Sequence, residues 1–275
     1  MIGTGVGTVP GLHSYGGCEQ PHFRHDRFAD RVAAIFANPS LQGSPTMTIQ
    51  LHVWPTPNAY KVSIALEEMG LPYAVHAVNI GAGDQFQPDF LKIAPNNRMP
   101  AIVDPDGPDG KALSLFESGA ILIYLAEKTG KFRPKDPAVW YTHIQWLMWQ
   151  MGGVGPMFGQ AGHFILYAPE KVPYGIERYR NEAKRLLKVA NTRLGEAAFL
   201  GGDDYGIADM ATFPWVRNAP KYDIDLNDYP HVQRWFNAIA ARPAVQRGLA
   251  LLADKVKPAG TPLSDQEREN LYGKK

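Results

Sequence analysis

Three short segments carry side chains whose types and spacing suit the binding of a small polar ligand. The first is Thr56-Pro57-Asn58 at the start of an expected helix, where Pro57 suits the first helical turn. Thr56 and Asn58 are residue types that cap helix N-termini. The same hydroxyl and amide, together with free N–H groups and the positive end of the helix dipole, could also hold an anion such as a thiolate. Both interpretations stay open, since a cap that donates to a ligand uses the same geometry.

The other two segments also combine ligand-binding types with ordinary structural explanations. Pro100 opens an expected strand, and a cis Met99-Pro100 bond would turn the backbone of Met99 outward to pair with an extended peptide. The ordinary alternative is a trans bond, because most X-Pro bonds are trans. Glu117 and Ser118 stand at a helix start, where they could cap the helix or bind the ammonium and carboxylate of a ligand.

The supply of sulfur limits the chemistry that these segments can support. Cys18 is the only cysteine, which excludes a disulfide scaffold, a CxxC redox pair and a zinc site built on several cysteines. Cys18, His22 and His25 could ligate a metal, but a fourth ligand is missing, so we expect no metal site. If the protein performs sulfur chemistry, the reactive sulfur must therefore come mainly from a ligand.

The composition is that of a folded chain without an obvious macromolecular target. The chain has 275 residues, of which 45% are hydrophobic and 20% charged, and its formal net charge is +1. This balance argues against disorder and provides no basic surface for nucleic acid. The most continuously apolar stretch, residues 119–126, is far shorter than the ~20 residues of a membrane span, and the N-terminus lacks a secretory signal. We therefore expect a cytoplasmic protein that binds neither nucleic acid nor membrane.

Residues 47–130 have the pattern of a small α/β domain in the order βαβαββα. Strand patterns lie at 49–54, 73–79, 100–103 and 112–115, and helical patterns lie at 58–69, 88–93 and 117–128. In front of this domain, residues 1–46 form an extension that we expect to be irregular, with one short helix at 26–36.

The strand signals vanish after Gly130, and residues 131–258 are expected to form an all-α domain. Helical patterns lie at 138–151, 174–196, 207–216, 229–241 and 244–253. The glycines at 152, 153, 155 and 159 resemble a phosphate loop, but no strand precedes them and no Gly-Lys-Ser/Thr follows. They indicate a helix break or close helix packing instead. Residues 259–275 form a polar tail that we expect to fray.

Residues 48 to about 255 resemble the glutathione transferases, and in particular the Nu class of bacterial glutathione transferase-like disulfide-bond oxidoreductases. The resemblance is carried by Thr56-Pro57-Asn58, GDQF at 83–86, NNRMPAI at 96–102, LFESGAIL at 115–122, GPMFGQ at 155–160, YGIERY at 174–179 and IAD at 207–209. It implies a thioredoxin-like domain followed by an all-helical one. The sequence departs from the family at Gly206, because the family usually has Ser or Thr at this position, three residues before the Asp, where it forms a capping box. We assign Asp209 to folding and give it no catalytic role.

The resemblance implies glutathione as cosubstrate, with its sulfur near Thr56 and Asn58 and its cysteinyl amide on the Met99 backbone. Other transferase classes place a Tyr, Ser or Cys near the end of the first strand. Here Tyr60 and Ser63 lie further along the helix, and we expect structural roles for both. Activation of the thiol must then come from neutral donors and the helix dipole.

The resemblance also implies how the rest of the ligand is held. Glu117 and Ser118 would bind the γ-glutamyl end, and Gln85 and Arg178 would reach further polar groups of one or two glutathione molecules. Members of the class are dimers, so a homodimer is expected.

Room for two glutathione molecules, which the resemblance implies, favours one function, a glutathione-dependent disulfide-bond reductase that uses the glutathione thiolate and no protein cysteine. Gln160 and His163 could line a second-substrate pocket, although a surface or core histidine is the simpler interpretation. One alternative is a glutathione S-transferase or peroxidase that acts on electrophiles or hydroperoxides. Another is a non-catalytic glutathione-binding regulatory protein, which the N-terminal extension keeps open.

Overall fold

The computed structural model describes residues 48–257 and 261–273. The expected extension at 1–46, its short helix and the Cys18, His22 and His25 group lie outside the described residues. Among the helices that are described, none combines the length and the apolar character that crossing a membrane would require.

A four-stranded sheet forms the centre of the first domain, with the strands in the order β2-β1-β3-β4. The strands are β1 (Ile49–Val53), β2 (Tyr73–Ala77), β3 (Ala101–Asp104) and β4 (Leu113–Phe116). β1 and β2 are parallel, whereas β3 pairs with β1 and with β4 in the antiparallel sense. The order βαβαββα is therefore confirmed.

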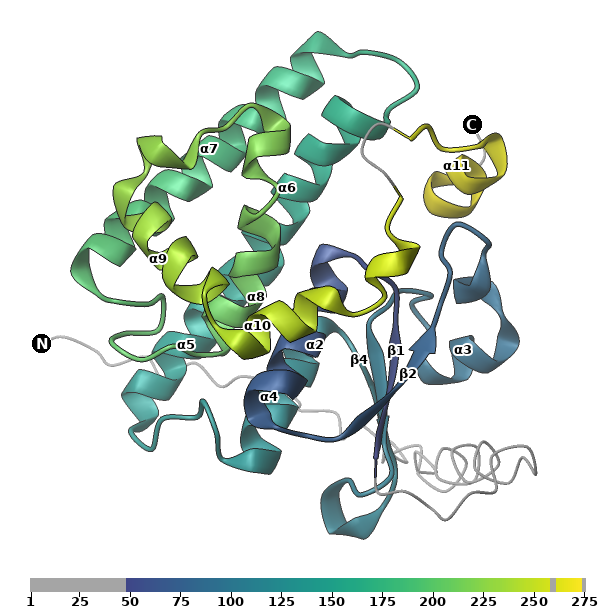
Figure 1. The fold of residues 1–275 in the computed structure, drawn as a ribbon, viewed down its shortest axis with the longest axis vertical. Coiled ribbons are helices and arrows are strands. Elements are labelled where there is room, and N and C mark those ends of the chain that lie inside the picture. The colour runs from purple at the N-terminus through teal and green to yellow at the C-terminus, as the bar shows by residue number, and fades with distance from the viewer. Residues whose placement is uncertain (1–47, 258–260, 274–275) are drawn as a thin grey trace, which may run out of the picture.

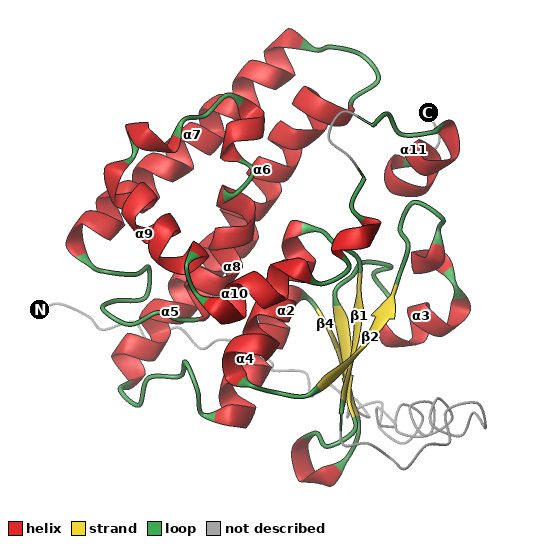
Figure 2. Ribbon diagram, in the orientation of Figure 1, coloured by secondary structure: helices red, strands yellow, loops and turns green. Residues whose placement is uncertain are grey.

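Helices cover both faces of this sheet (Figure 2). α2 (Pro57–Met69) and α4 (Ser118–Thr129) lie on one face, and the short α3 (Pro88–Ile93) lies on the other. The side chains of β1 alternate accordingly: Leu51 is fully buried in the main core, whereas His52 points to the other face and contacts Phe90 of α3. The β1 to α2 junction lies at the C-terminal end of a central strand, on the side of the sheet that α2 and α4 cover.

The second domain is helical, and its core is continuous with that of the first. Its helices are α5 (Pro137–Trp149), α6 (Gly155–Gly162), α7 (Pro173–Glu196), α8 (Ile207–Val216), α9 (Pro230–Ala240) and α10 (Pro243–Ala250). α2 packs against α4, α8 and α10, so one helix belongs to both halves of the core. Ser63 has the structural role expected of it, since its hydroxyl donates to the carbonyl of Gly248 in α10 at 2.8 Å.

Asp209 also has the folding role assigned to it. The carboxylate is fully buried and accepts hydrogen bonds from the Leu200 N–H, the Gly206 N–H and the Trp235 indole N–H at 2.9, 3.0 and 2.8 Å. It therefore ties α8 to α9 and to the preceding loop.

One of the two alternatives for the glycine-rich stretch, and the expectation for the C-terminal tail, are wrong. The glycine-rich stretch does not break the helix: Gln150–Val154 form a π-helical turn that joins α5 to α6. The alternative of close helix packing is correct, because Cβ atoms on Gly155 and Gly159 would each lie 3.5 Å from the Trp215 ring of α8. The polar tail is not frayed throughout either, since α11 (Asp265–Tyr272) begins with a capping box between Ser264 and Glu267.

A stacked pair of histidines makes the stability of the sheet depend on pH. The rings of His52 in β1 and His76 in β2 lie 4.7 Å apart, and His76 Nε2 lies 2.7 Å from the Gln50 side-chain oxygen. Burial, and then the charge of His76, lowers the pKa of His52 to about 4, and burial lowers the pKa of His76. These two histidines therefore bind more protons in the unfolded chain than in the folded one between about pH 6.5 and pH 4.

We therefore expect the histidine pair to contribute its full stabilisation above about pH 6.5 and to lose about 2 kcal/mol of it between pH 7 and pH 5. The buried carboxyl of Asp209, whose pKa burial raises to about 6, changes stability in the opposite direction over the same range. Urea unfolding of the wild-type protein and of His52→Asn at the two pH values isolates the contribution of the histidine pair. His52→Asn should remove most of it, whereas His231→Gln, a change at an exposed histidine of α9, should leave it intact. An unchanged pH dependence in His52→Asn would assign the effect to other groups.

Candidate active site

Thr56 caps α2 and also points at the residue before Pro100. Its hydroxyl oxygen accepts from the Ala59 N–H at 3.4 Å, and its hydroxyl donates to the Met99 sulfur at 3.6 Å. The capping interpretation of Thr56 is therefore correct, and the Met99-Pro100 peptide bond is cis. Two of the three candidate segments meet here, with a hydroxyl donor already directed at a sulfur atom.

Asn58 has a different role from the capping one considered for it. Its side-chain oxygen accepts a hydrogen bond from the indole N–H of Trp215 in α8 at 3.0 Å. Because an indole N–H can only donate, this contact identifies the oxygen end of the amide, so the Nδ2 group is the end available to a ligand. Trp215 thus fixes Asn58 as a hydrogen-bond donor in the first turn of α2.

The third segment shows backbone strain at the start of α4. Glu117 has φ 69° and ψ 110°, and its exposed side chain makes no capping hydrogen bond. A non-glycine residue held at positive φ costs about 1–3 kcal/mol, and such residues cluster at ligand sites. The capping explanation for Glu117 is therefore wrong, and its carboxylate remains free to meet a ligand.

Ser118 leads to a residue that sequence analysis missed. Its hydroxyl oxygen lies 3.3 Å from the ammonium of Lys61, which is 1% exposed and donates to the Gln150 side-chain oxygen at 2.6 Å. Burial lowers the pKa of Lys61 to about 7, and the charge of Glu117 acts in the opposite direction. A signal was present in the sequence, because Lys61 is the only cation in α2.

Gln85 lies in a 3₁₀ turn, Asp84–Phe86, beside the C-terminal helix. Its side-chain nitrogen donates to the Asn270 carbonyl at 3.0 Å, while its side-chain oxygen is buried without a hydrogen-bond partner among the described residues. Asn270 also donates to the Gly81 carbonyl at 2.6 Å. Figure 1 shows the result: α11 lies directly beside the loop between β2 and α3.

The remaining candidates lie in the helical domain. His163 is half-buried, and its ring packs 4.9 Å from that of Tyr272 in α11, so one helix contacts both Gln85 and His163. Gln160 of α6 and Arg178 of α7 are exposed. Within the described residues, no hydrogen bond or ion pair joins Arg178 to the Thr56, Asn58 and Ser118 region.

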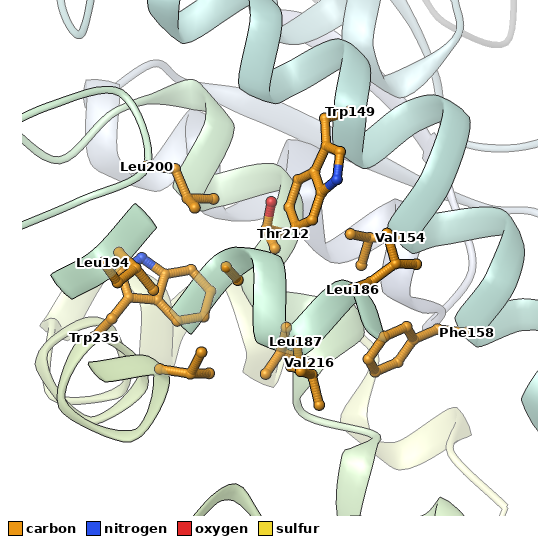
Figure 3. Close-up of a pocket in the computed structure, with 12 residues that line it drawn as sticks. Trp149, Val154, Phe158, Leu186, Leu187, Leu194, Leu200, Thr212, Val216 and Trp235 are labelled. Atoms are coloured by element: carbon orange, nitrogen blue, oxygen red, sulfur yellow. The ribbon is translucent and has the colours of Figure 1, made fainter. Parts of the chain in front are cut away.

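A small internal cavity belongs to the helical core and not to this site. It measures about 10 Å³, at the lower limit for a single water molecule, and its lining is apolar apart from Thr212. Figure 3 shows Trp149, Phe158 and Trp235 around it, all from the helical domain. In the part of the chain that the structure describes, no cluster of metal-ligating side chains occurs.

Comparison with known families identifies the class of protein that this fold and site define. The family model described as "Glutathione S-transferase, N-terminal domain" matches residues 47–127, and the one described as "Glutathione S-transferase, C-terminal domain" matches residues 156–243. The chain therefore belongs to the glutathione S-transferase family.

Two relatives from Escherichia coli narrow the comparison within the family. The disulfide-bond oxidoreductase YfcG is 50% identical over 202 residues, which cover 73% of this chain and 94% of the relative. The disulfide-bond oxidoreductase YghU is 41% identical, with 80% of this chain and 79% of the relative covered. The identification as a glutathione transferase similar to the disulfide-bond oxidoreductases is thus confirmed.

Solved structures give the same result. A glutathione transferase from Burkholderia graminis, with two glutathione molecules bound per subunit, is 47% identical with a TM-score of 0.74 and covers 85% of this chain and 98% of its own. One from Pseudomonas putida, with one glutathione disulfide bound per subunit, is 43% identical with a TM-score of 0.74 and covers 83% and 99%. These structures share both domains with the chain.

Proposed function

We propose that this protein is a glutathione-dependent disulfide-bond reductase in which bound glutathione supplies the reactive thiolate. The observation that carries the proposal is the fixed amide of Asn58, whose oxygen accepts from Trp215 and whose donor end is free in the first turn of α2. Beside it, the Thr56 hydroxyl is directed at a sulfur atom, that of Met99. Two neutral donors and a helix N-terminus together favour a negatively charged sulfur.

The required shift of the thiol pKa is within reach of such a site. A free thiol has a pKa of about 8.5, so only a few per cent is ionised at pH 7. Donors at a helix N-terminus that lower this pKa by roughly one to two units would make the thiolate a large fraction. The phenol of Tyr60 is a poor competitor for this role, since burial raises its pKa.

The reaction balances with two glutathione molecules for each disulfide. The first thiolate attacks one sulfur of the substrate, forms a mixed disulfide and expels the other sulfur as a thiolate, which takes up a proton. A second glutathione thiolate then attacks the glutathione sulfur of the mixed disulfide, which yields glutathione disulfide and the second reduced thiol. Relatives with two glutathione molecules or one glutathione disulfide per subunit support this stoichiometry.

The other site residues take part in this proposal as binding groups. The Met99 backbone would bind the cysteinyl amide, and Glu117 and Ser118 the γ-glutamyl ammonium and carboxylate. Gln85 and Arg178 would reach further polar groups of the ligand.

The proposal also covers the second-substrate pocket, the oligomeric state and the cellular compartment. Gln160 and His163 would border the space for the second substrate. A homodimer in the reducing cytoplasm completes the proposal, because that compartment maintains reduced glutathione.

Turnover with three substrates tests the reaction type. We expect glutathione-dependent reduction of 2-hydroxyethyl disulfide to exceed conjugation of chlorodinitrobenzene and reduction of cumene hydroperoxide. Thr56→Val should lower disulfide turnover about 10-fold through the loss of one donor to the thiolate. Tyr60→Phe, in the same helix, should retain wild-type activity.

Each contrary outcome identifies a different function. Disulfide turnover no faster than the uncatalysed rate would refute the reductase. Faster turnover of chlorodinitrobenzene or cumene hydroperoxide would favour a transferase or peroxidase, and tight glutathione binding without any turnover would favour a regulatory protein.

A further inference from the structure

Lys61 is a buried cation without an anionic partner. Its side chain is 1% exposed, and its ammonium contacts the Gln150 side-chain oxygen at 2.6 Å, the Ser118 hydroxyl at 3.3 Å and the Met151 sulfur at 3.3 Å. All three partners are neutral. No carboxylate of residues 48–257 and 261–273 lies within ion-pair distance of this ammonium. Burying an ammonium in this way is costly unless a negative charge arrives to pair with it.

The surroundings of Lys61 are built around its side chain. A Cβ on Gly155 would lie 2.9 Å from the Gln150 amide nitrogen, and a Cβ on Gly119 would lie 3.0 Å from Met151. Two glycines thus make room for the groups that hold the ammonium in place. The Gln150 amide nitrogen is buried without a partner in the described part of the chain, so the amide gives up one hydrogen bond while its oxygen faces Lys61.

The position of Lys61 connects it to the ligand-binding end of α4. Ser118 is the first residue of α4, and it follows the strained and exposed Glu117. Lys61 itself lies one turn after Asn58 on α2. Lys61 therefore lies one helical turn from the donor proposed for the sulfur, and its ammonium contacts the hydroxyl proposed for the γ-glutamyl carboxylate.

We propose that Lys61 is a positioning residue for glutathione: acting through Ser118, its ammonium attracts the α-carboxylate of the γ-glutamyl group, and Lys61 takes up a proton when that carboxylate binds. This inference rests on the proposed function, because it requires glutathione to bind with its γ-glutamyl end at Ser118.

The proton uptake follows from the charges around Lys61. With its pKa lowered to about 7 by burial, Lys61 is largely neutral at about pH 8 in the free protein. The negative charge of Glu117 opposes this shift. When glutathione binds, its γ-glutamyl ammonium would neutralise part of that charge. A carboxylate next to Ser118 adds a new negative charge close to Lys61 and raises its pKa. Binding above about pH 7 should therefore be coupled to protonation.

Calorimetric titration with S-methylglutathione tests the proposal, because this analogue has the γ-glutamyl carboxylate but no thiol proton to release. Titrations at about pH 8 in phosphate and in Tris, which differ in ionisation enthalpy, give the number of protons taken up. We expect about 0.5–1 proton per site for the wild-type protein. Lys61→Met should abolish the uptake and raise Kd about 10- to 100-fold.

Two further variants separate this role from a purely structural one. Lys61→Arg keeps a permanent charge, so it should retain more affinity than Lys61→Met while showing no proton uptake. Lys131→Met is the matched control: the Lys131 ammonium donates to the Met69 carbonyl at the end of the same helix at 2.6 Å, and its loss should leave uptake and Kd unchanged.

The outcomes distinguish this inference from the proposed function. Binding of S-methylglutathione by the wild-type protein without proton uptake would overturn the role of Lys61 and leave the reductase intact, even if Lys61→Met failed to fold. Uptake that persists in Lys61→Met would have the same meaning. No binding of S-methylglutathione and no turnover with glutathione would refute both.

Discussion

Asn58→Asp is expected to lower kcat/KM for glutathione-dependent disulfide reduction by about 10²- to 10³-fold. The substitution is nearly isosteric, and a carboxylate oxygen can still accept from the Trp215 indole, as the Asn58 oxygen does at 3.0 Å. It removes the only donor of the amide and places a negative charge beside the sulfur. Both changes disfavour the thiolate, so the thiol pKa of bound glutathione should rise.

Two measurements check this prediction: steady-state turnover with 2-hydroxyethyl disulfide, and titration of the bound thiolate by its ultraviolet absorbance. Asn191→Asp is the matched control. Asn191 in α7 accepts from the His231 and Val232 backbone N–H groups at 3.0 and 3.3 Å, and a carboxylate keeps both bonds. Wild-type activity in Asn58→Asp would mean that the amide does not donate to the sulfur.

Gly206→Ser is expected to destabilise the protein by about 3 kcal/mol, although serine is a better helix cap than glycine. Gly206 is the N-cap residue of α8. In this chain a Cβ on Gly206 would lie 2.3 Å from the ring of His143, which is 1% exposed. Gly201 encloses the same ring from another side, with a Cβ distance of 2.2 Å. Because the ring is buried and enclosed from two sides, displacing it disrupts packing, and we expect the overlap to outweigh the few tenths of a kcal/mol that the cap would add.

Urea unfolding of three variants tests this explanation. Gly152→Ser is the control, because a Cβ there meets nothing within 4 Å, and we expect a change of less than about 0.5 kcal/mol. The double variant His143→Ala with Gly206→Ser should lose less free energy of unfolding than the two single variants lose together, since removing the ring removes the overlap. Additive effects would show that His143 is not the cause.

The contrast between Gly206 and Asp209 shows which structural roles can be predicted from neighbouring residues and which cannot. The carboxylate of Asp209 and its place three residues after the cap are readable along the chain, and the folding role inferred from them is correct. The reason for glycine at the cap is not local. It lies in His143, which α5 supplies and the fold brings into the space where a side chain at the cap would go.

The same distinction applies to the candidate site. The amino-acid sequence by itself determined the order βαβαββα, the helical second half, the cap at Thr56 and the lack of a suitable protein thiol. These features depend on periodicity, residue type and neighbours a few positions apart. It also carried enough of the family motifs to indicate glutathione. It did not reveal that α11 would form and contact Gln85, because a polar eight-residue helix acquires its stability from the surface on which it docks.

Only the tertiary structure decided which atoms of these motifs are available to a ligand. Which end of the Asn58 amide is free depends on Trp215, which is 157 positions away in the sequence. The environment of the Lys61 ammonium depends on Gln150, which is 89 positions away. A hydrogen-bond donor or a buried charge is defined by the partners and the solvent around it. The packing of α2 against α4, α8 and the π-helical turn sets these partners and this solvent exposure. Neither can be inferred from the residues adjacent in the sequence.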